Sequence, residues 1–366
     1  MEKCAMKILS KARYAVSIFF AAAILLTSCG ANDSYDDTTR VVTTYKNIYD
    51  IGEFATNSAG GLFFGDFDTL ETVYVCSKPN CTHSDETCSA YGFNIVPTTP
   101  FVYHGDNLYW FTLEHIYNDD NMLTTDCKLH KCDLDGTNRV TVASLSEGLG
   151  VNCVHLVLDG DVMYFIVSPD RSMNKSDQIP VYLYSYTFSE NKVEQIMQIC
   201  EGYSSYAEPR GIFDGKLYLV YAEYDRPLST IVADGGDQAD YRHEVTIDLE
   251  TLEMEEAEKA PIGISDGVLL SIDDSGVQIT EPDGSVYMAT EFEPQEWYGY
   301  DVVNGMLICQ MMGTAYDYKN DKYYTVNSGG KTVVDWRNGK YILRAQDENL
   351  WYTYSAADAD EIFIQQ

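Results

Sequence analysis

One short pattern recurs along this chain and restricts the folds that are open to it: a turn containing Gly, Asp or Asn, followed at once by an apolar strand. Seven copies of the pattern begin at Gly60, Gly105, Asp159, Asp214, Asp266, Asn304 and Asn338. The steps between successive copies are 45, 54, 55, 52, 38 and 34 residues, with a mean of about 46. A repeat of this length is typical of one four-stranded blade of a β-propeller.

The second half of each repeat is consistent with such a blade. A strand, a turn and a final strand follow the first pair, and Asp135-Gly136 and Asp283-Gly284 are typical hairpin turns because Gly accepts a positive φ. We predict an all-β protein with a β-propeller of about seven blades over residues 41–366. Six blades would result if the first and last copies completed one blade together. The alternative fold is a β-sandwich or two stacked all-β domains.

One stretch also resembles a known family. The sequence from Gly105 to His115, followed by residues 129–142 with their Asp-Leu-Asp-Gly-Thr-Asn hairpin, is similar to YWTD-type and TolB-like β-propellers. The similarity covers about residues 103–145 and is weaker elsewhere. The YWTD tetrad is degraded here to Tyr109-Trp110-Phe111-Thr112. The resemblance implies a propeller fold and implies no reaction.

The N-terminus has the features of an export signal. A basic start precedes an uncharged apolar run over residues 15–26, which is too short to span a bilayer comfortably. The run ends in Leu26-Thr27-Ser28-Cys29, which resembles the bacterial lipoprotein box. That resemblance implies removal of residues 1–28 and a lipid on Cys29, with residues 29–40 as a flexible acidic tether. An ordinary secretory signal is the alternative.

The charge of the chain excludes one class of partner. The formal net charge is −33, and loss of the first 28 residues would remove four positive charges and one negative charge, leaving −36. Such a surface repels phosphate backbones, so we expect no nucleic-acid binding. We expect a protein that is held by its lipid on the outer face of the bacterial cell membrane or envelope.

A cluster of metal-ligating residues lies in the first repeat. Cys76, Cys81, His83 and Cys88 follow the spacing Cys-x4-Cys-x-His-x4-Cys. Three thiolates and one imidazole are a common ligand set for structural zinc, and the short gaps allow one loop to wrap one ion. The two ligand pairs are closer together than those of a zinc finger. The cluster therefore predicts a closed structural zinc site.

Disulfides are the competing interpretation of the same cysteines. An oxidising exterior favours them, and eight cysteines remain once Cys4 and Cys29 are set aside. Three cysteines in the cluster would leave one without a local partner, and Cys127 or Cys132 in the next repeat would have to supply it. A third interpretation is a loop of reduced cysteines that binds nothing.

Five aromatic residues in the stretches between repeats are candidates for a binding face: Tyr203, Tyr206, Trp297, Tyr298 and Tyr300. On a propeller they could stack on sugars or clasp a peptide, or they could belong to the core. We predict a non-catalytic binding or scaffold module for a protein or glycan partner. The alternative is a propeller enzyme acting on polysaccharide, a lyase or a glycosidase, which needs acid–base groups gathered on one face.

Overall fold

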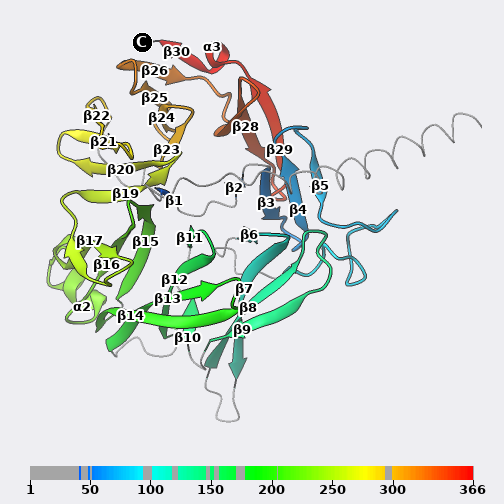
Figure 1. Ribbon diagram of the computed structural model, residues 1–366, viewed down its shortest axis with the longest axis horizontal. Helices are drawn as coiled ribbons and strands as arrows, with labels where there is room; N and C mark the ends of the chain where they lie inside the picture. The colour runs from blue at the N-terminus through cyan, green and yellow to red at the C-terminus, as the bar shows by residue number, and fades with distance from the viewer. Residues whose placement is uncertain are drawn as a thin grey trace, which may run out of the picture.

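The chain folds into seven antiparallel sheets arranged around a common centre, a seven-bladed β-propeller (Figure 1). The computed structural model describes residues 41–42, 48–49, 52–93, 101–117, 123–145, 149–151, 156–169, 178–203, 205–292 and 299–365. The prediction of an all-β propeller is confirmed, and the number of blades is seven. The predicted signal peptide, residues 1–28, and the predicted tether, residues 29–40, lie outside the described residues. No helix within the described ranges is long and apolar enough to cross a membrane.

Blades one to three come from the first half of the chain. Blade one contains β2 (Ile48–Tyr49), β3 (Gly52–Thr56), β4 (Leu62–Asp66) and β5 (Thr72–Tyr74). Blade two contains β6 (Val102–His104), β7 (Asn107–Tyr117), β8 (Leu123–Asp133) and β9 (Val140–Ser144). Blade three contains β10 (Leu149–Val151), β11 (Val157–Asp159), β12 (Val162–Pro169), β13 (Gln178–Thr187) and β14 (Lys192–Tyr203). Both β10 and β11 pair with β12, at opposite ends of that strand.

Blades four to seven follow, and two of them recruit a strand from a chain end. Blade four contains β1 (Val41–Val42), β15 (Tyr206–Phe213), β16 (Lys216–Ala222), β17 (Arg242–Asp248) and β18 (Met254–Glu256). Blade five contains β19 (Ala260–Ser265), β20 (Val268–Asp273), β21 (Gly276–Thr280) and β22 (Val286–Ala289). Blade six contains β23 (Tyr300–Val303), β24 (Met306–Cys309), β25 (Thr314–Asp317), β26 (Lys322–Val326) and β30 (Phe363–Gln365). Blade seven contains β27 (Thr332–Arg337), β28 (Lys340–Gln346) and β29 (Tyr352–Ala357).

The few helical segments are short. The helix α2 (Leu228–Ala233) and the 3-10 helix η1 (Gln238–Tyr241) form an insertion between β16 and β17. The helix α3 (Ala359–Ile362) leads into β30. Ile231 of α2 is fully buried and contacts Ala222 and Tyr224, so the insertion packs against blade four.

The recurring turns collect on one side of the ring. Neighbouring strands in each sheet are antiparallel, so the connections from first to second strand and from third to fourth strand share one edge. We call this side the turn face, and the opposite side, with the remaining connections, the loop face. The backbone N–H of Asn304, in the turn of blade six, donates a 3.0 Å hydrogen bond to Asp266 Oδ2, in the turn of blade five. Contacts between turns on this face therefore link these two successive blades.

Two details of the predicted repeat are wrong. When β1 and β10, the additional strands of blades four and three, are not counted, six copies of the pattern connect the first and second strands of their blades. Gly60-Gly61 instead connects β3 and β4, the second and third strands of blade one. Four strands per blade is also not general, because blade seven has three described strands while blades three, four and six have five. The additional strands in blades four and six come from the ends of the chain, which no repeat pattern can assign.

The N-terminal strand runs in a definite direction. β15 ends at the Asp214-Gly215 turn and so runs towards the turn face. β1 is antiparallel to it, with Val41 opposite Phe213 and Val42 opposite Ile212. The chain therefore enters β1 at the turn face and leaves it towards the loop face.

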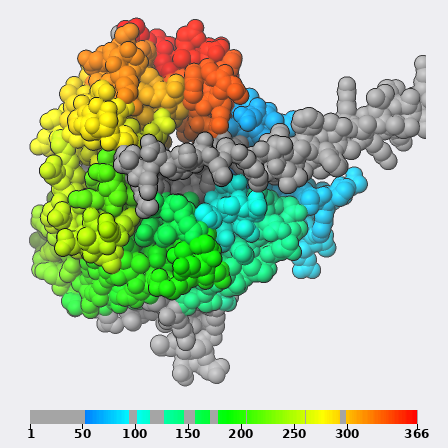
Figure 2. All heavy atoms as spheres, in the orientation of Figure 1, coloured from blue at the N-terminus to red at the C-terminus, as the bar shows by residue number. Residues whose placement is uncertain are grey.

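The seam between blades seven and one closes the ring through side chains. These two blades share no strand among the residues described, although they lie side by side, as the blue and orange-red segments of Figure 2 show. Phe67 of the first blade is 1% exposed and packs with Ile342 and Tyr354 of the last. Glu53 forms an ion pair with Arg344, and the Tyr354 hydroxyl donates to Glu53 Oε2 at 3.0 Å. The Thr72 hydroxyl donates to the Tyr352 carbonyl at 2.6 Å.

Candidate metal centre

The Cys-His cluster lies in the loop that follows β5 and leads towards the second blade. Two residues in this loop, Asn80 at φ 58° and His83 at φ 56°, take the left-handed conformation. Asn and His adopt it more readily than most residues other than Gly. These two bends fold the loop back, so that Cys88 returns to the position of Cys76 and Cys81.

The four side chains converge as the sequence predicts. One donor atom from each of Cys76, Cys81, His83 and Cys88 lies within 4.8 Å of every other. His83 Nδ1 is 3.3 Å from Cys88 Sγ. Zinc–sulfur bonds of about 2.3 Å in a tetrahedron place sulfur atoms about 3.8 Å apart. The donors need to contract by no more than about 1 Å to hold such an ion, so the residues fit a metal of this type.

The electrostatics of the loop favour ligation. Burial opposes ionisation of Cys76, but hydrogen bonds from Ser89 and from the Lys78 backbone outweigh it and lower the pKa of Cys76 to about 7. Burial raises the pKa of Cys88, whose sulfur accepts a hydrogen bond from the Ala90 amide at 3.3 Å. Burial also lowers the pKa of His83, so its ring is neutral at neutral pH. A metal would replace the protons that the thiols otherwise keep.

The structure holds the cluster cysteines as thiols. Cys76, Cys81 and Cys88 form no disulfide with one another. Cys127 and Cys132, the partners that a disulfide interpretation requires, are 0% and 1% exposed inside the apolar cores of blade two. Cys200 and Cys309 are buried, and a cysteine in such a position packs as a small apolar residue. Cys29 and Cys153 lie outside the described residues.

Blade two supports the loop from one side. The Ser77 hydroxyl donates to Asp135 Oδ2 at 3.0 Å, and the Arg139 guanidinium donates to the Ser89 carbonyl. Arg139 also lies over the ring of Phe93, 3.8 Å from its centre. A Cβ atom on Gly136 would stand 2.3 Å from the Ser89 carbonyl oxygen, so the loop and the hairpin turn are in close contact.

Aromatic rings support the loop from the other side. The His83 ring stacks on Tyr74 of β5, with centroids 4.3 Å apart and planes 21° from parallel. Tyr74 in turn lies 4.9 Å from Trp351, at the start of the last strand of blade seven. The Asn57 amide donates to the Tyr74 hydroxyl at 2.9 Å. The cluster therefore touches the seam, which sequence reasoning did not anticipate because Trp351 is remote in the chain.

The predicted aromatic face is only partly within the described chain. Tyr203 and Tyr206 are partly buried and pack against the small cluster of Ala222, Tyr224 and Ile231 beneath α2. Tyr300 is 8% exposed and lies 6.0 Å from Phe292 in a core between blades. Trp297 and Tyr298 lie outside the described residues. The structure thus does not gather the three described tyrosines into one exposed surface.

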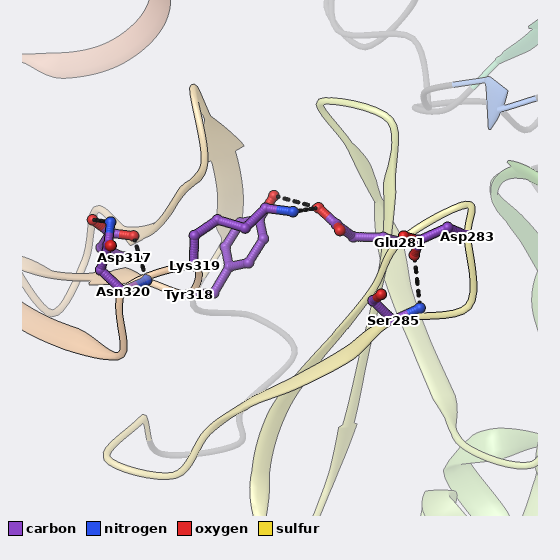
Figure 3. Close-up of polar contacts among 7 residues, drawn as sticks. All are labelled: Glu281, Asp283, Ser285, Asp317, Tyr318, Lys319 and Asn320. Atoms are coloured by element: carbon purple, nitrogen blue, oxygen red, sulfur yellow. Dashed lines mark hydrogen bonds and ion pairs between the residues drawn. The ribbon is translucent and has the colours of Figure 1, made fainter.

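A second polar group joins blades five and six at the turn face (Figure 3). Glu281, with a side chain 15% exposed, accepts from the Tyr318 hydroxyl at 3.3 Å and pairs with Lys319. Lys319 also lies 5.3 Å from the centre of the Tyr287 ring. The Glu281 carboxylate is thus satisfied by Lys319 and Tyr318, and these contacts hold blade five against blade six.

Comparisons with known proteins find only distant structural similarity. No protein-family model matches the sequence, and no curated protein matches it. Among solved structures, an α-L-arabinanase from Penicillium chrysogenum complexed with arabinobiose has 9% identity and a TM-score of 0.41, over 89% of this chain and 95% of that one. An oligogalacturonate lyase in complex with manganese has 12% identity and a TM-score of 0.39, over 79% and 74%. The AfRom2 CNH domain has 9% identity and a TM-score of 0.40, over 88% and 96%. Likeness of this degree assigns neither a ligand nor a reaction.

Proposed function

We propose that this protein is an envelope-anchored binding module, a non-catalytic propeller that is held by lipid on Cys29 and presents its loop face to a protein or glycan. The direction of β1 is the observation that carries this proposal. The proposed tether, residues 29–40, leads directly into β1, and the chain enters β1 at the turn face. Twelve extended residues reach at most about 40 Å. The anchor therefore favours an orientation with the turn face towards the membrane.

The loop face then points away from the membrane, where a partner can reach it. It carries the α2 insertion and the turn between β24 and β25, where Met311 and Met312 are exposed. Exposed methionines adapt to varied partner surfaces and are enriched in protein interfaces. The net charge of −33 also keeps the domain away from anionic lipid headgroups.

The anchor and the binding role are tested separately. Cells that express the protein are grown with labelled palmitate, and we expect the label on the wild type and none on Cys29→Ala. The purified domain is then incubated with envelope polysaccharide from the same cells. Sedimentation with the polysaccharide, without new reducing ends or unsaturated products, supports a binding module. Accumulation of such products would instead identify the enzyme of the alternative interpretation.

We further infer that Cys76, Cys81, His83 and Cys88 hold one structural zinc ion. Convergence of four soft or borderline donors supports this assignment, and all four tetrahedral positions would be filled by protein, leaving none for substrate. We expect about one zinc per chain by metal analysis. Cys81→Ser should lower zinc affinity by more than about a hundredfold, since it removes a ligand rather than a supporting contact.

Cys200→Ala is the matched control, because Cys200 is buried in another blade. It should keep the full zinc content of the wild type. Zinc-free wild-type protein with all cluster thiols titratable, or cluster thiols lost to disulfides in the native protein, would overturn the assignment.

A further inference from the structure

We propose that zinc binding at this cluster locks the seam between blades seven and one, so that the ion closes the ring as well as the loop. The inference rests on the zinc site proposed above. It assigns the ion a role beyond its own loop, because the loop contacts blades one and two and is linked through Tyr74 to Trp351 of blade seven.

His83 is the first link. It would ligate the ion and also stacks on Tyr74 at 4.3 Å, so the ion fixes the ring that Tyr74 packs against. Its backbone is left-handed, at φ 56°, a conformation that His adopts more readily than most residues other than Gly. A metal bond from its ring would hold both the imidazole and this bend in place.

Tyr74 is the second link, since it carries the contact across the seam. Its ring lies 4.9 Å from Trp351 of the last blade, and Trp351 lies 4.7 Å from Phe63 of the first. A hydrogen bond from Asn57 to the Tyr74 hydroxyl fixes the outer end of the ring. Tyr74 is thus held between the metal loop and the last blade.

The Trp351 turn is also joined directly to the first blade. The Ser58 amide donates to the Asn349 carbonyl at 2.9 Å, and the Asp347 carboxylate accepts from the Trp351 amide at 2.9 Å. The loop itself is fixed to blade two through Asp135 and Arg139. Blade two is thus linked to blade seven through the loop and then through Tyr74.

Reciprocity makes this arrangement testable. If zinc binds more tightly when the seam is closed, then a change that favours the open seam must weaken zinc binding. Trp351→Leu removes the ring that Tyr74 contacts and leaves all four ligands in place. We expect its zinc affinity to fall about tenfold, measured by competition with a chromophoric chelator.

Trp336→Leu is the control, because Trp336 lies in the same blade and packs on Tyr341 at 4.5 Å instead of on Tyr74. It should change zinc affinity by less than about threefold. Equal losses in the two variants would mean that zinc senses the general stability of blade seven, and would overturn the proposal.

Hydrogen exchange on the unmutated protein gives a second test. Chelation should accelerate exchange in residues 57–66 and 347–354 far more than in residues 206–222 of blade four. If zinc is bound but its removal leaves the seam segments unchanged, the locking role is wrong while the zinc site stands. A uniform increase in all blades also rejects a seam-specific role. If no zinc is bound, the underlying assignment fails first.

Discussion

Glu53 is a carboxylate in an unfavourable position for a charge. Its side chain is 3% exposed at the seam, beside Arg344 and Tyr354. Burial raises its pKa, and the charge of Arg344 with the hydrogen bonds from Tyr354 and Arg344 offsets only part of that effect. Removing a charged group from water is costly even when a partner is present. We therefore expect Glu53 to contribute more to the orientation of blade one against blade seven than to the free energy of unfolding.

The raised pKa predicts a pH dependence of stability. Between the usual value of 4.5 and the higher folded value, the native protein binds more protons at Glu53 than the unfolded chain does. The contribution of Glu53 to the free energy of unfolding therefore falls as pH rises through this window. We expect Glu53→Gln to flatten the dependence between pH 4.5 and 7, measured by urea unfolding.

Asp248 supplies the control for that measurement. It lies in an exposed turn, where hydrogen bonds from the Thr251 and Glu250 amides lower its pKa below 3.8. Asp248→Asn should alter the pH dependence of stability only below about that pH and leave the slope above 4.5 as in the wild type. Identical slopes for the wild type and Glu53→Gln would contradict the role given to Glu53.

At the scale of elements, the contact to test is the one between the Cys-His loop and the turn of the β8–β9 hairpin. Gly136 at φ 75° and Gly215 at φ 72° have nearly the same backbone conformation. Of these two glycines, only Gly136 would bring an added Cβ atom within 4 Å of other atoms, with the Ser89 carbonyl oxygen nearest. Substituting each glycine in turn therefore separates the free-energy cost of the left-handed backbone from the cost of steric crowding.

Alanine substitutions at these two positions should differ. Gly215→Ala should lower the free energy of unfolding by about 1–2 kcal/mol, the cost of a left-handed L-residue. Gly136→Ala should lower it by about 2–5 kcal/mol, since a clash with the loop is added. Urea unfolding of both variants measures the difference. Equal costs would show that the loop yields easily and is not firmly seated on the hairpin.

Local patterns predicted the elements well and their long-range pairing poorly. The four ligands lie within 13 residues, so their spacing alone predicted the cluster. Trp351 and Arg139 support the same loop from distant parts of the chain, and no local pattern links them to it. Gly60-Gly61 matched the repeat because any β-turn before an apolar strand resembles any other. The strand that β30 adds to blade six likewise follows from tertiary pairing, not from sequence period.

On the scale of the whole molecule, the excess of negative charge lowers the stability of the folded state. The chain carries 57 acidic and 24 basic side chains. Most of its ion pairs are partly exposed, such as Lys340 with Asp358, and pairs of that kind contribute little. Repulsion among the remaining carboxylates therefore destabilises the folded ring.

Salt should accordingly stabilise this protein. Raising sodium chloride from about 0.05 to 0.5 M shortens the screening length to a few ångströms. We expect a gain on the order of 1 kcal/mol, or about 2 °C in Tm, measured by calorimetry on the zinc-loaded protein. Potassium chloride should act equally. A fall in Tm would show that attraction between paired charges outweighs the repulsion.

The positions of the two chain ends also determine the order in which the blades can be completed during folding. Val41 pairs with Phe213, Glu53 with Arg344, and the last strand, β30, with β26. As the polypeptide is made from its N-terminus, blade four cannot be completed until more than half of the chain exists, and the seam must wait for almost all of it. Contacts between residues so distant in sequence form slowly. A newly made molecule therefore passes through an open arc of blades, whose unpaired ends need protection from aggregation until the final residues arrive.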